Sequence, residues 1–228
     1  RLRARLEQVI AQAEAVKQHA KVQAVLDLIE RIGDRVIIFT EYRATQQYLL
    51  YVLEQRGILA LGFDGTMSAS RKEWTKELFR RYAQVLVSTE SGGEGLNFQF
   101  CAHLINYDLP WNPMKVEQRI GRIHRLGQTR DVHVYNLITA DTIEEYILHL
   151  LYEKIRLFEL AVGELDEILS AASLVPSDLA RELTEILTKA RSPGEIKERL
   201  AELATRIDEA KRTRGLASRI NLDALLGD

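Results

Sequence analysis

The stretch Arg35-Val-Ile-Ile-Phe-Thr40 decides the fold class, because it is a short apolar run rich in β-branched residues. A run of this length and composition is typical of a strand buried on both faces. A helical pattern follows over residues 45–55 and closes at Gly57, and a second strand is expected over 58–63. The chain therefore alternates between strand and helix from residue 35 onward.

The alternation continues toward the C-terminus. Ser70 with Glu73 predicts a capping box for a helix that runs through Tyr82. Further strands are expected over 84–89, 102–107 and 132–138. Strands separated by helices of about ten to fifteen residues imply parallel βαβ units. We therefore predict an α/β domain with a mostly parallel sheet.

Helical segments flank this domain on both sides. Residues 1–32 carry apolar side chains at helical spacing, and Gly33 with Asp34 ends that pattern. From residue 164 the pattern is wholly helical, with 10 basic against 13 acidic residues, which argues against wrapping of DNA by this tail. We expect three parts: an N-terminal helical segment over 1–32, the α/β domain over 33–163, and a helical extension over 164–228.

The overall composition excludes several classes of protein. The 228 residues are 46% hydrophobic and 28% charged, so the chain can form a core and is not wholly disordered. Cys101 is the sole cysteine, so an intramolecular disulfide and a cysteine-rich zinc site are both excluded. No apolar run is long enough for a membrane span, and no signal-peptide pattern is present. Because the chain starts at Arg1, we expect it to be a piece of a longer protein.

The segment from Gln118 to Gln128 (QRIGRIHRLGQ) carries the clearest chemical signal. If it is helical, then Gln118, Arg122 and Arg125 share one face, and Gly121 allows that face to approach a ligand closely. Guanidinium groups on a shared face suit phosphate oxygens. The alternative is a solvated basic helix. Residues 115–130 carry five basic side chains against Glu117 alone, and the charge of the whole chain, −2, conceals this concentration.

A glycine-rich loop, residues 88–97, follows the expected strand over 84–89. Ligands of open α/β sheets gather at the carboxyl ends of strands, where this loop would expose backbone N–H groups. Taken alone, the glycines are weak evidence, and a plain turn explains them better. The chain has no Gly-Lys-Ser/Thr sequence, so it cannot by itself cradle a triphosphate and hold magnesium.

Other polar residues also follow expected strands. Thr40 and Arg43 come after the first strand and are suited to backbone phosphate. Asp64, Gly65 and Thr66 follow the second. Trp111, in the proline-stiffened stretch after the fourth strand, either stacks on a base or sugar or is a buried anchor of its loop.

The five histidines do not point to a metal site. Cys101 and His103 form a lone near pair, and no third or fourth ligand lies at a metal-binding spacing. We therefore expect structural roles for the histidines and predict no metal bound by this chain alone.

Taken together and in this order, the segments resemble the second RecA-like lobe of superfamily-two helicases, specifically the prokaryotic Swi/Snf-type ATPases. Residues 35–42 resemble motif IV, residues 88–97 motif V, and residues 118–128 motif VI. The resemblance covers roughly residues 33–160. It implies a RecA-like three-layer domain with a mostly parallel sheet, flanked by an N-terminal helix and a C-terminal all-helical extension.

The resemblance also implies roles for individual residues. Arg122 and Arg125 match the arginine fingers that stabilise charge on the γ-phosphate of ATP in the transition state. Gly95, Asn97 and Gln118 match positions that face the nucleotide or couple it to nucleic acid. The residues that match the nucleic-acid track are Thr40, Arg43, Thr66, Ser88, Thr89 and Trp111. Many members of the family carry Arg where this chain has Glu90, and a carboxylate there is not expected to contact phosphate directly.

The function implied is that of the second motor lobe of an ATP-dependent translocase on double-stranded DNA. ATP and Mg²⁺ would be held mainly by a first lobe upstream, so this chain alone is predicted to be inactive as an ATPase. Two alternatives are a protein-docking module, for example on RNA polymerase or a defence complex, and a true strand-separating helicase. The helical tail is a candidate brace or partner-docking surface. We expect a cytoplasmic, nucleoid-associated protein of a prokaryote, with no membrane partner.

Overall fold

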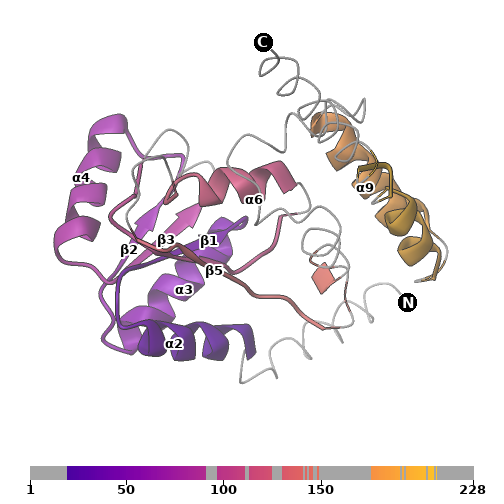
Figure 1. Cartoon of the computed structure of the whole chain (residues 1–228). Helices are drawn as coiled ribbons and strands as arrows, with labels where there is room; N and C mark the ends of the chain where they lie inside the picture. Colours follow the sequence, from indigo (N-terminus) through magenta and orange to yellow (C-terminus); the bar gives the residue numbers. More distant parts are fainter. Residues whose placement is uncertain are drawn as a thin grey trace, which may run out of the picture.

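The computed structural model describes residues 20–90, 97–110, 113–124, 130–140, 142, 144, 145, 148, 176–190, 192, 194–203, 205–207 and 209. Figure 1 shows a central sheet with helices on both sides and a helical extension at the right. Within the described residues, no helix is both long enough and apolar enough to cross a membrane.

The sheet contains five parallel strands in the order β2-β3-β1-β4-β5. The strands are β1 (Val36–Thr40), β2 (Ala60–Phe63), β3 (Val85–Thr89), β4 (His103–Asn106) and β5 (His133–Asn136). The central strand β1 pairs Thr40 with Thr89 of β3, and Phe39 with Asn106 of β4. The ends of β1, β3 and β4 therefore lie in line at one edge. This confirms the predicted α/β fold and its parallel sheet.

Two hydrophobic cores cover the two faces of the sheet. Because successive side chains of a strand point to opposite faces, Val36 and Ile38 of β1 join one core while Ile37 and Phe39 join the other. The first core is closed by helices α2 (Ala20–Ile32) and α3 (Arg43–Gln55), which flank the lower side of the sheet in Figure 1. The second core contains Phe79 of α4 (Ala69–Arg81). The arrangement is three-layered, as expected.

Glycine ends two of the helices where the sequence pattern predicted. Gly33 (φ +61°) follows α2 and donates its N–H to the carbonyl of Ile29 at 3.1 Å. Gly57 (φ +68°) follows α3. Both residues adopt the left-handed conformation that only glycine takes without strain, so each marks a C-terminal cap.

The predicted N-terminal cap of α4 is wrong by two residues. Ser68, not Ser70, is the cap, and its hydroxyl accepts the N–H of Arg71 at 3.3 Å. Ser70 lies inside the helix. Both serines satisfy the composition rule for a cap, and the turn after Asp64 favours the earlier one.

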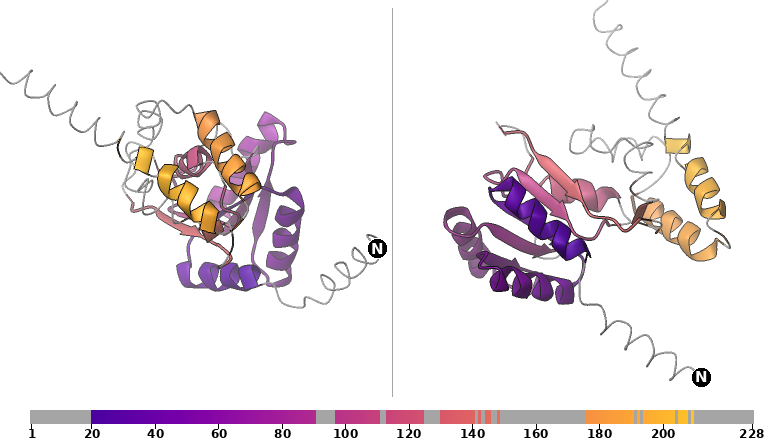
Figure 2. Two further views of the ribbon diagram at one scale, coloured as in Figure 1. Left: turned by 90° about the vertical axis from the view of Figure 1, so that its right-hand side faces the viewer. Right: turned by 90° about the horizontal axis from the view of Figure 1, so that it is seen from below.

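The C-terminal extension is helical in its described part. Helix α9 (Pro176–Lys189) is followed by helical residues 194–203. The hydroxyl of Ser192, which precedes them, accepts the N–H of Glu195 at 3.2 Å. Leu183, Ile186, Leu200, Leu203 and Ile207 are buried. Figure 1 and the right-hand view of Figure 2 place α9 apart from the sheet, on the side opposite α4. The predicted boundary at 163/164 lies outside the described residues.

Candidate functional site

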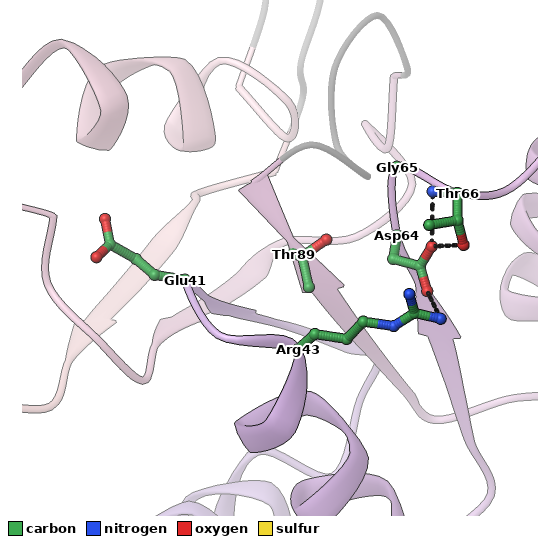
Figure 3. Close-up of a pocket in the computed structure, with 6 residues that line it drawn as sticks. All are labelled: Glu41, Arg43, Asp64, Gly65, Thr66 and Thr89. Atoms are coloured by element: carbon green, nitrogen blue, oxygen red, sulfur yellow. Dashed lines mark hydrogen bonds and ion pairs between the residues drawn. The ribbon is translucent and has the colours of Figure 1, made fainter.

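A cavity of about 370 Å³ lies at the carboxyl ends of β1, β2 and β3 (Figure 3). Its lining residues follow or end these strands: Glu41, Arg43, Asp64, Gly65, Thr66 and Thr89. Three of the residues that the sequence matched to the nucleic-acid track, Arg43, Thr66 and Thr89, therefore line one cavity. The parallel sheet brings them together because all of its strands end at the same edge.

Asp64 already binds two of the cavity residues that are suited to contact a phosphate, Thr66 and Arg43. Its Oδ1 accepts the backbone N–H of Thr66 at 2.8 Å and the Thr66 hydroxyl at 2.5 Å. Its Oδ2 lies 3.8 Å from a guanidinium nitrogen of Arg43. The Thr66 hydroxyl is the main reason that the pKa of Asp64 is lowered, and Arg43 adds to the effect. Figure 3 shows Arg43 reaching toward Asp64 while Glu41 points away from both.

Thr40 and Ser88 do not line this cavity, and both are fully buried. The Thr40 hydroxyl donates to Oδ2 of Asp108, which also accepts the N–H of Glu41 at 3.2 Å. The Ser88 hydroxyl donates to the carbonyl of Thr89 at 3.0 Å. Both hydroxyl groups are thus bonded within the fold, where a large ligand has no direct access to them.

The segment matched to motif VI is not one continuous helix. Helix α6 (Pro113–Ile120) contains Gln118, which is exposed, but the helix ends before Arg122. Arg122 lies in a turn and donates its N–H to the carbonyl of Arg119 at 3.1 Å. The expected single helical face through Gln118, Arg122 and Arg125 therefore does not extend beyond α6 in the described residues.

The residue that directly follows the segment matched to motif V is hydrogen-bonded to the segment matched to motif VI. The N–H of Phe98 donates to the carbonyl of Arg122 at 2.8 Å, so Asn97 and Arg122 are brought close although 25 positions separate them in the sequence. Asn97 forms a local turn, in which its Oδ1 accepts the N–H of Gln99 at 2.9 Å. Gly95, Trp111 and Arg125 lie outside the described residues, so the two interpretations of Trp111 both stay open.

Much of the basic charge expected over residues 115–130 is paired with carboxylates from distant parts of the chain. Arg119 binds Glu90 in two ways, through Nε at 2.8 Å and through a second, shorter contact of its guanidinium. Lys115 lies 3.2 Å from Glu90. Arg130 pairs with Asp34 at 2.5 Å. The concentration of positive charge seen in the sequence is therefore partly neutralised in the fold.

Arg119 is the residue that sequence reasoning missed. Its side chain is only 3% exposed and lies over the ring of Phe39, 5.3 Å from the ring centroid. One guanidinium nitrogen donates to Oδ1 of Asn106 and to the carbonyl of Asp108, both at 2.8 Å. Burial lowers the pKa of Arg119, and the Glu90 carboxylate opposes that shift. The signal available in the sequence was Glu90 itself, a carboxylate at a strand end that needed a partner.

Comparison with known proteins finds a family model that matches much of the α/β domain. Residues 20–127 match the family model of the helicase conserved C-terminal domain.

This part of the chain is therefore similar to a helicase conserved C-terminal domain.

The relatives of this chain support the same resemblance. The chain is 53% identical over 197 residues to the uncharacterized ATP-dependent helicase YqhH of Bacillus subtilis, covering 86% of the chain and 35% of that protein. It is 31% identical over 196 residues to the helicase domino of Drosophila melanogaster, covering 82% of the chain and 6% of that protein. The resemblance to Swi/Snf-type helicases is thereby confirmed. The chain spans about a third of the Bacillus relative and far less of the other.

A solved structure agrees with the helicase fold. The C-terminal part of the Fun30 ATPase domain matches 58% of the chain and 45% of its own length, with a TM-score of 0.54 and 28% identity. The RecA-like assignment is therefore confirmed for the α/β domain. The cavity and the turn that contains Arg122 are two separate polar sites. The Glu90–Arg119 pair connects them, because Glu90 follows the cavity residue Thr89 and Arg119 is bonded to Arg122.

Proposed function

We propose that this chain is the second motor lobe of an ATP-dependent translocase on double-stranded DNA, of the Swi/Snf type. In this proposal it supplies arginine fingers for ATP hydrolysis and part of the nucleic-acid track. The observation that carries the proposal is the hydrogen bond from Phe98 to the carbonyl of Arg122. It joins the residue directly after the segment matched to motif V to the segment matched to motif VI, within the residues that match the helicase family model. The 53% identity to an ATP-dependent helicase supports it.

The proposal assigns the transition-state contacts to Arg122 and Arg125. ATP would bind mainly to the first lobe with Mg²⁺, and its γ-phosphoryl group would be the reacting centre. A guanidinium suits the developing negative charge, because it stays protonated and presents several donors. Arg122 is partly exposed beside Asn97, a position compatible with contact to a phosphate on the facing lobe.

The first test replaces the fingers in the longer protein that contains both lobes. Arg122→Ala and Arg125→Ala are each expected to lower kcat for ATP by about 10³–10⁵, with a smaller change in KM. Arg81→Ala is the matched control, because Arg81 is an exposed arginine on α4 that pairs with Glu77. If Arg122→Ala retained full activity, the assignment of this finger would be wrong.

The proposal also assigns backbone-phosphate contacts to the cavity at the strand ends. Arg43 is more than half exposed, so it can turn from Asp64 to a phosphate without unfolding its helix. Thr66 and Thr89 would add hydroxyl donors, and the buried Thr40 and Ser88 would hold the strand ends through their hydrogen bonds within the fold. Arg43→Ala is expected to weaken DNA binding uniformly across sequences and to reduce the salt dependence by about one phosphate contact. An unchanged salt dependence would remove Arg43 from the track.

Two further assays separate this function from its alternatives. The isolated chain is expected to show no ATPase activity, because it contains no Gly-Lys-Ser/Thr loop. The two-lobed protein is expected to move on duplex DNA without separating strands. Displacement of a strand from a tailed duplex would instead favour a true helicase. We place the protein in the prokaryotic cytoplasm, at the nucleoid, as a consequence of this substrate.

A further inference from the structure

We propose that Glu90 and Arg119 form a positioning pair that couples nucleic acid in the strand-end cavity to the placement of Arg122. The proposal rests on the proposed function for the roles of the cavity and of Arg122. Neither residue of the pair is assigned a contact with ATP or with nucleic acid. Their role is to transmit a displacement from the cavity to Arg122. Glu90 directly follows the cavity residue Thr89, and Arg119 is hydrogen-bonded to Arg122.

The pair connects the two groups by a short series of direct contacts. Glu90 follows Thr89, which lines the cavity. Its carboxylate accepts two hydrogen bonds from the Arg119 guanidinium. The carbonyl of Arg119 in turn accepts the N–H of Arg122 at 3.1 Å. A displacement at the end of β3 therefore reaches the Arg122 turn through one ion pair and one backbone hydrogen bond.

The surroundings of Arg119 make this connection stiff. The guanidinium also binds Asn106 at the end of β4, and the amide of Asn106 donates to Oδ1 of Asn136 in β5 at 2.8 Å. Arg119 thereby fixes α6 to the ends of several strands at once. A buried side chain with several simultaneous partners has few alternative positions, so it moves together with the groups that it binds.

Lys115 connects the Glu90–Arg119 pair to the cavity, because it contacts both Glu90 and the cavity residue Glu41. Its ammonium lies 3.2 Å from Glu90 and 3.6 Å from Glu41, and Glu41 lines the cavity. Despite partial burial, these two carboxylates raise the pKa of Lys115. The lysine side chain is 43% exposed, so an arriving phosphate can attract it away from Glu90. Glu90 would then be balanced by Arg119 alone, and its bonds to that guanidinium would tighten.

The test measures how strongly duplex DNA stimulates ATP hydrolysis by the two-lobed protein. The variants are Glu90→Gln, which keeps the size of the side chain, Arg119→Lys, which keeps the charge, and the double variant. Each single variant is expected to lower the ratio of stimulated to unstimulated kcat by about tenfold, within the usual range of coupling between sites. The double variant should lower it by no more than the larger single effect.

Controls separate coupling from loss of structure. Glu77→Gln removes the acidic partner of an ion pair on the exposed face of α4 and should leave the ratio unchanged. A merely structural role for the pair would reduce the stimulated and unstimulated rates by the same factor. That result would overturn the proposal, and so would an unchanged ratio in folded Glu90→Gln and Arg119→Lys proteins.

The proposed function can fail separately from this inference. If Arg122→Ala leaves ATP hydrolysis intact, the finger assignment fails, and the pair has no catalytic group to position. If Arg122→Ala abolishes hydrolysis while Glu90→Gln keeps the full stimulation ratio, only the coupling role is wrong.

Discussion

The carboxyl edge of the sheet, where the strands end, and the amino edge, where they begin, differ in how their charged side chains are buried. At the carboxyl edge, Glu90 and Arg119 form a largely buried ion pair whose arginine has further partners on β4 and in the loop after it. At the amino edge, Asp34 and Arg130 form an ion pair whose side chains are 33% and 51% exposed. The pairs are alike in chemistry and differ in their access to water.

The remaining groups follow the same division. The carboxyl edge carries the cavity, with hydroxyl, carboxylate and guanidinium groups in mutual contact. The amino edge carries stacked rings, His103 and His133, whose centroids are 5.1 Å apart with planes inclined by 10°. The thiol of Cys101 is buried nearby, 3.1 Å from the carbonyl of Arg35. The carboxyl edge of this domain therefore carries buried charge with several hydrogen-bond partners, whereas the amino edge carries packed rings and a buried thiol.

The largest expected effect is loss of stability at the carboxyl edge on Arg119→Met. Methionine fills a similar volume but removes the guanidinium that donates to Glu90, to Asn106 and to the carbonyl of Asp108. Removing one partner of a buried pair destabilises a protein by about 3–5 kcal/mol. We expect about 3 kcal/mol, because Glu90 keeps Lys115 and some access to water. Urea unfolding of the isolated chain measures it.

Arg81→Met is the control for this measurement, since its partner Glu77 lies on an exposed helix face. A loss for Arg119→Met that is no greater than the loss for Arg81→Met would break the comparison between buried and exposed pairs.

The next effect concerns the single thiol at the amino edge. Burial raises the pKa of Cys101 to about 12. Because the thiolate is the reactive form, iodoacetamide should alkylate Cys101 at least about a thousandfold more slowly in the native protein than in urea. Adding Thr66→Cys, an exposed position at the cavity, should give one fast and one slow thiol in the same molecule. Two fast thiols would contradict the packed amino edge.

A smaller effect is expected from His103 as the pH falls. Burial and then His133 lower the pKa of His103, while Asp34 opposes them. The unfolded chain, with a histidine pKa of about 6.5, therefore takes up the proton first. Stability contributed by neutral His103 is fully present above pH 6.5 and is lost as the pH falls through the lower, folded value. Arg130, which also faces this ring, acts in the same direction as burial.

His103→Phe keeps a ring in the stack and removes the titration. Its free energy of unfolding should fall less steeply than that of the parent between about pH 7 and 5. Equal slopes for the parent and His103→Phe would show that the ring does not report on the packing of this edge.

The difference between the edges also explains what the sequence revealed. Strand β1 was predictable because Val36–Thr40 is buried throughout, and burial on both faces leaves a local apolar run. The gathering of Arg43, Thr66 and Thr89 was predictable because all parallel strands end at one edge. Both inferences use only short-range pattern and a rule of topology.

The Glu90–Arg119 pair was not predictable, because its members lie 29 positions apart and ion pairs leave no periodic signal. The end of α6 at Ile120 was missed for a related reason. The stretch through Gly121 and Arg122 has a plausible helical pattern, and Gly121 still donates its N–H to the carbonyl of Glu117. The carbonyl of Arg122, however, accepts the N–H of Phe98. Such contacts exist only once the sheet has formed.

The smallest expected effect is at the exposed ion pair, on Arg130→Gln. Exposed pairs are worth about 0–1 kcal/mol, because water screens them and holding both side chains costs entropy. The hydrogen bond from Arg130 is the main cause of the lowered pKa of Asp34. The contribution of this carboxylate is therefore present above its unfolded pKa of about 3.9 and is lost as the pH falls through the lower, folded value.

Urea unfolding of the parent and of Arg130→Gln at pH 7, with and without 1 M salt, measures the contribution of the exposed pair to the free energy of unfolding. The difference at pH 7 should shrink in high salt, whereas the effect of Arg119→Met should persist because salt screens buried pairs far less. If both differences responded equally to salt, then access to water would not be what separates the two edges.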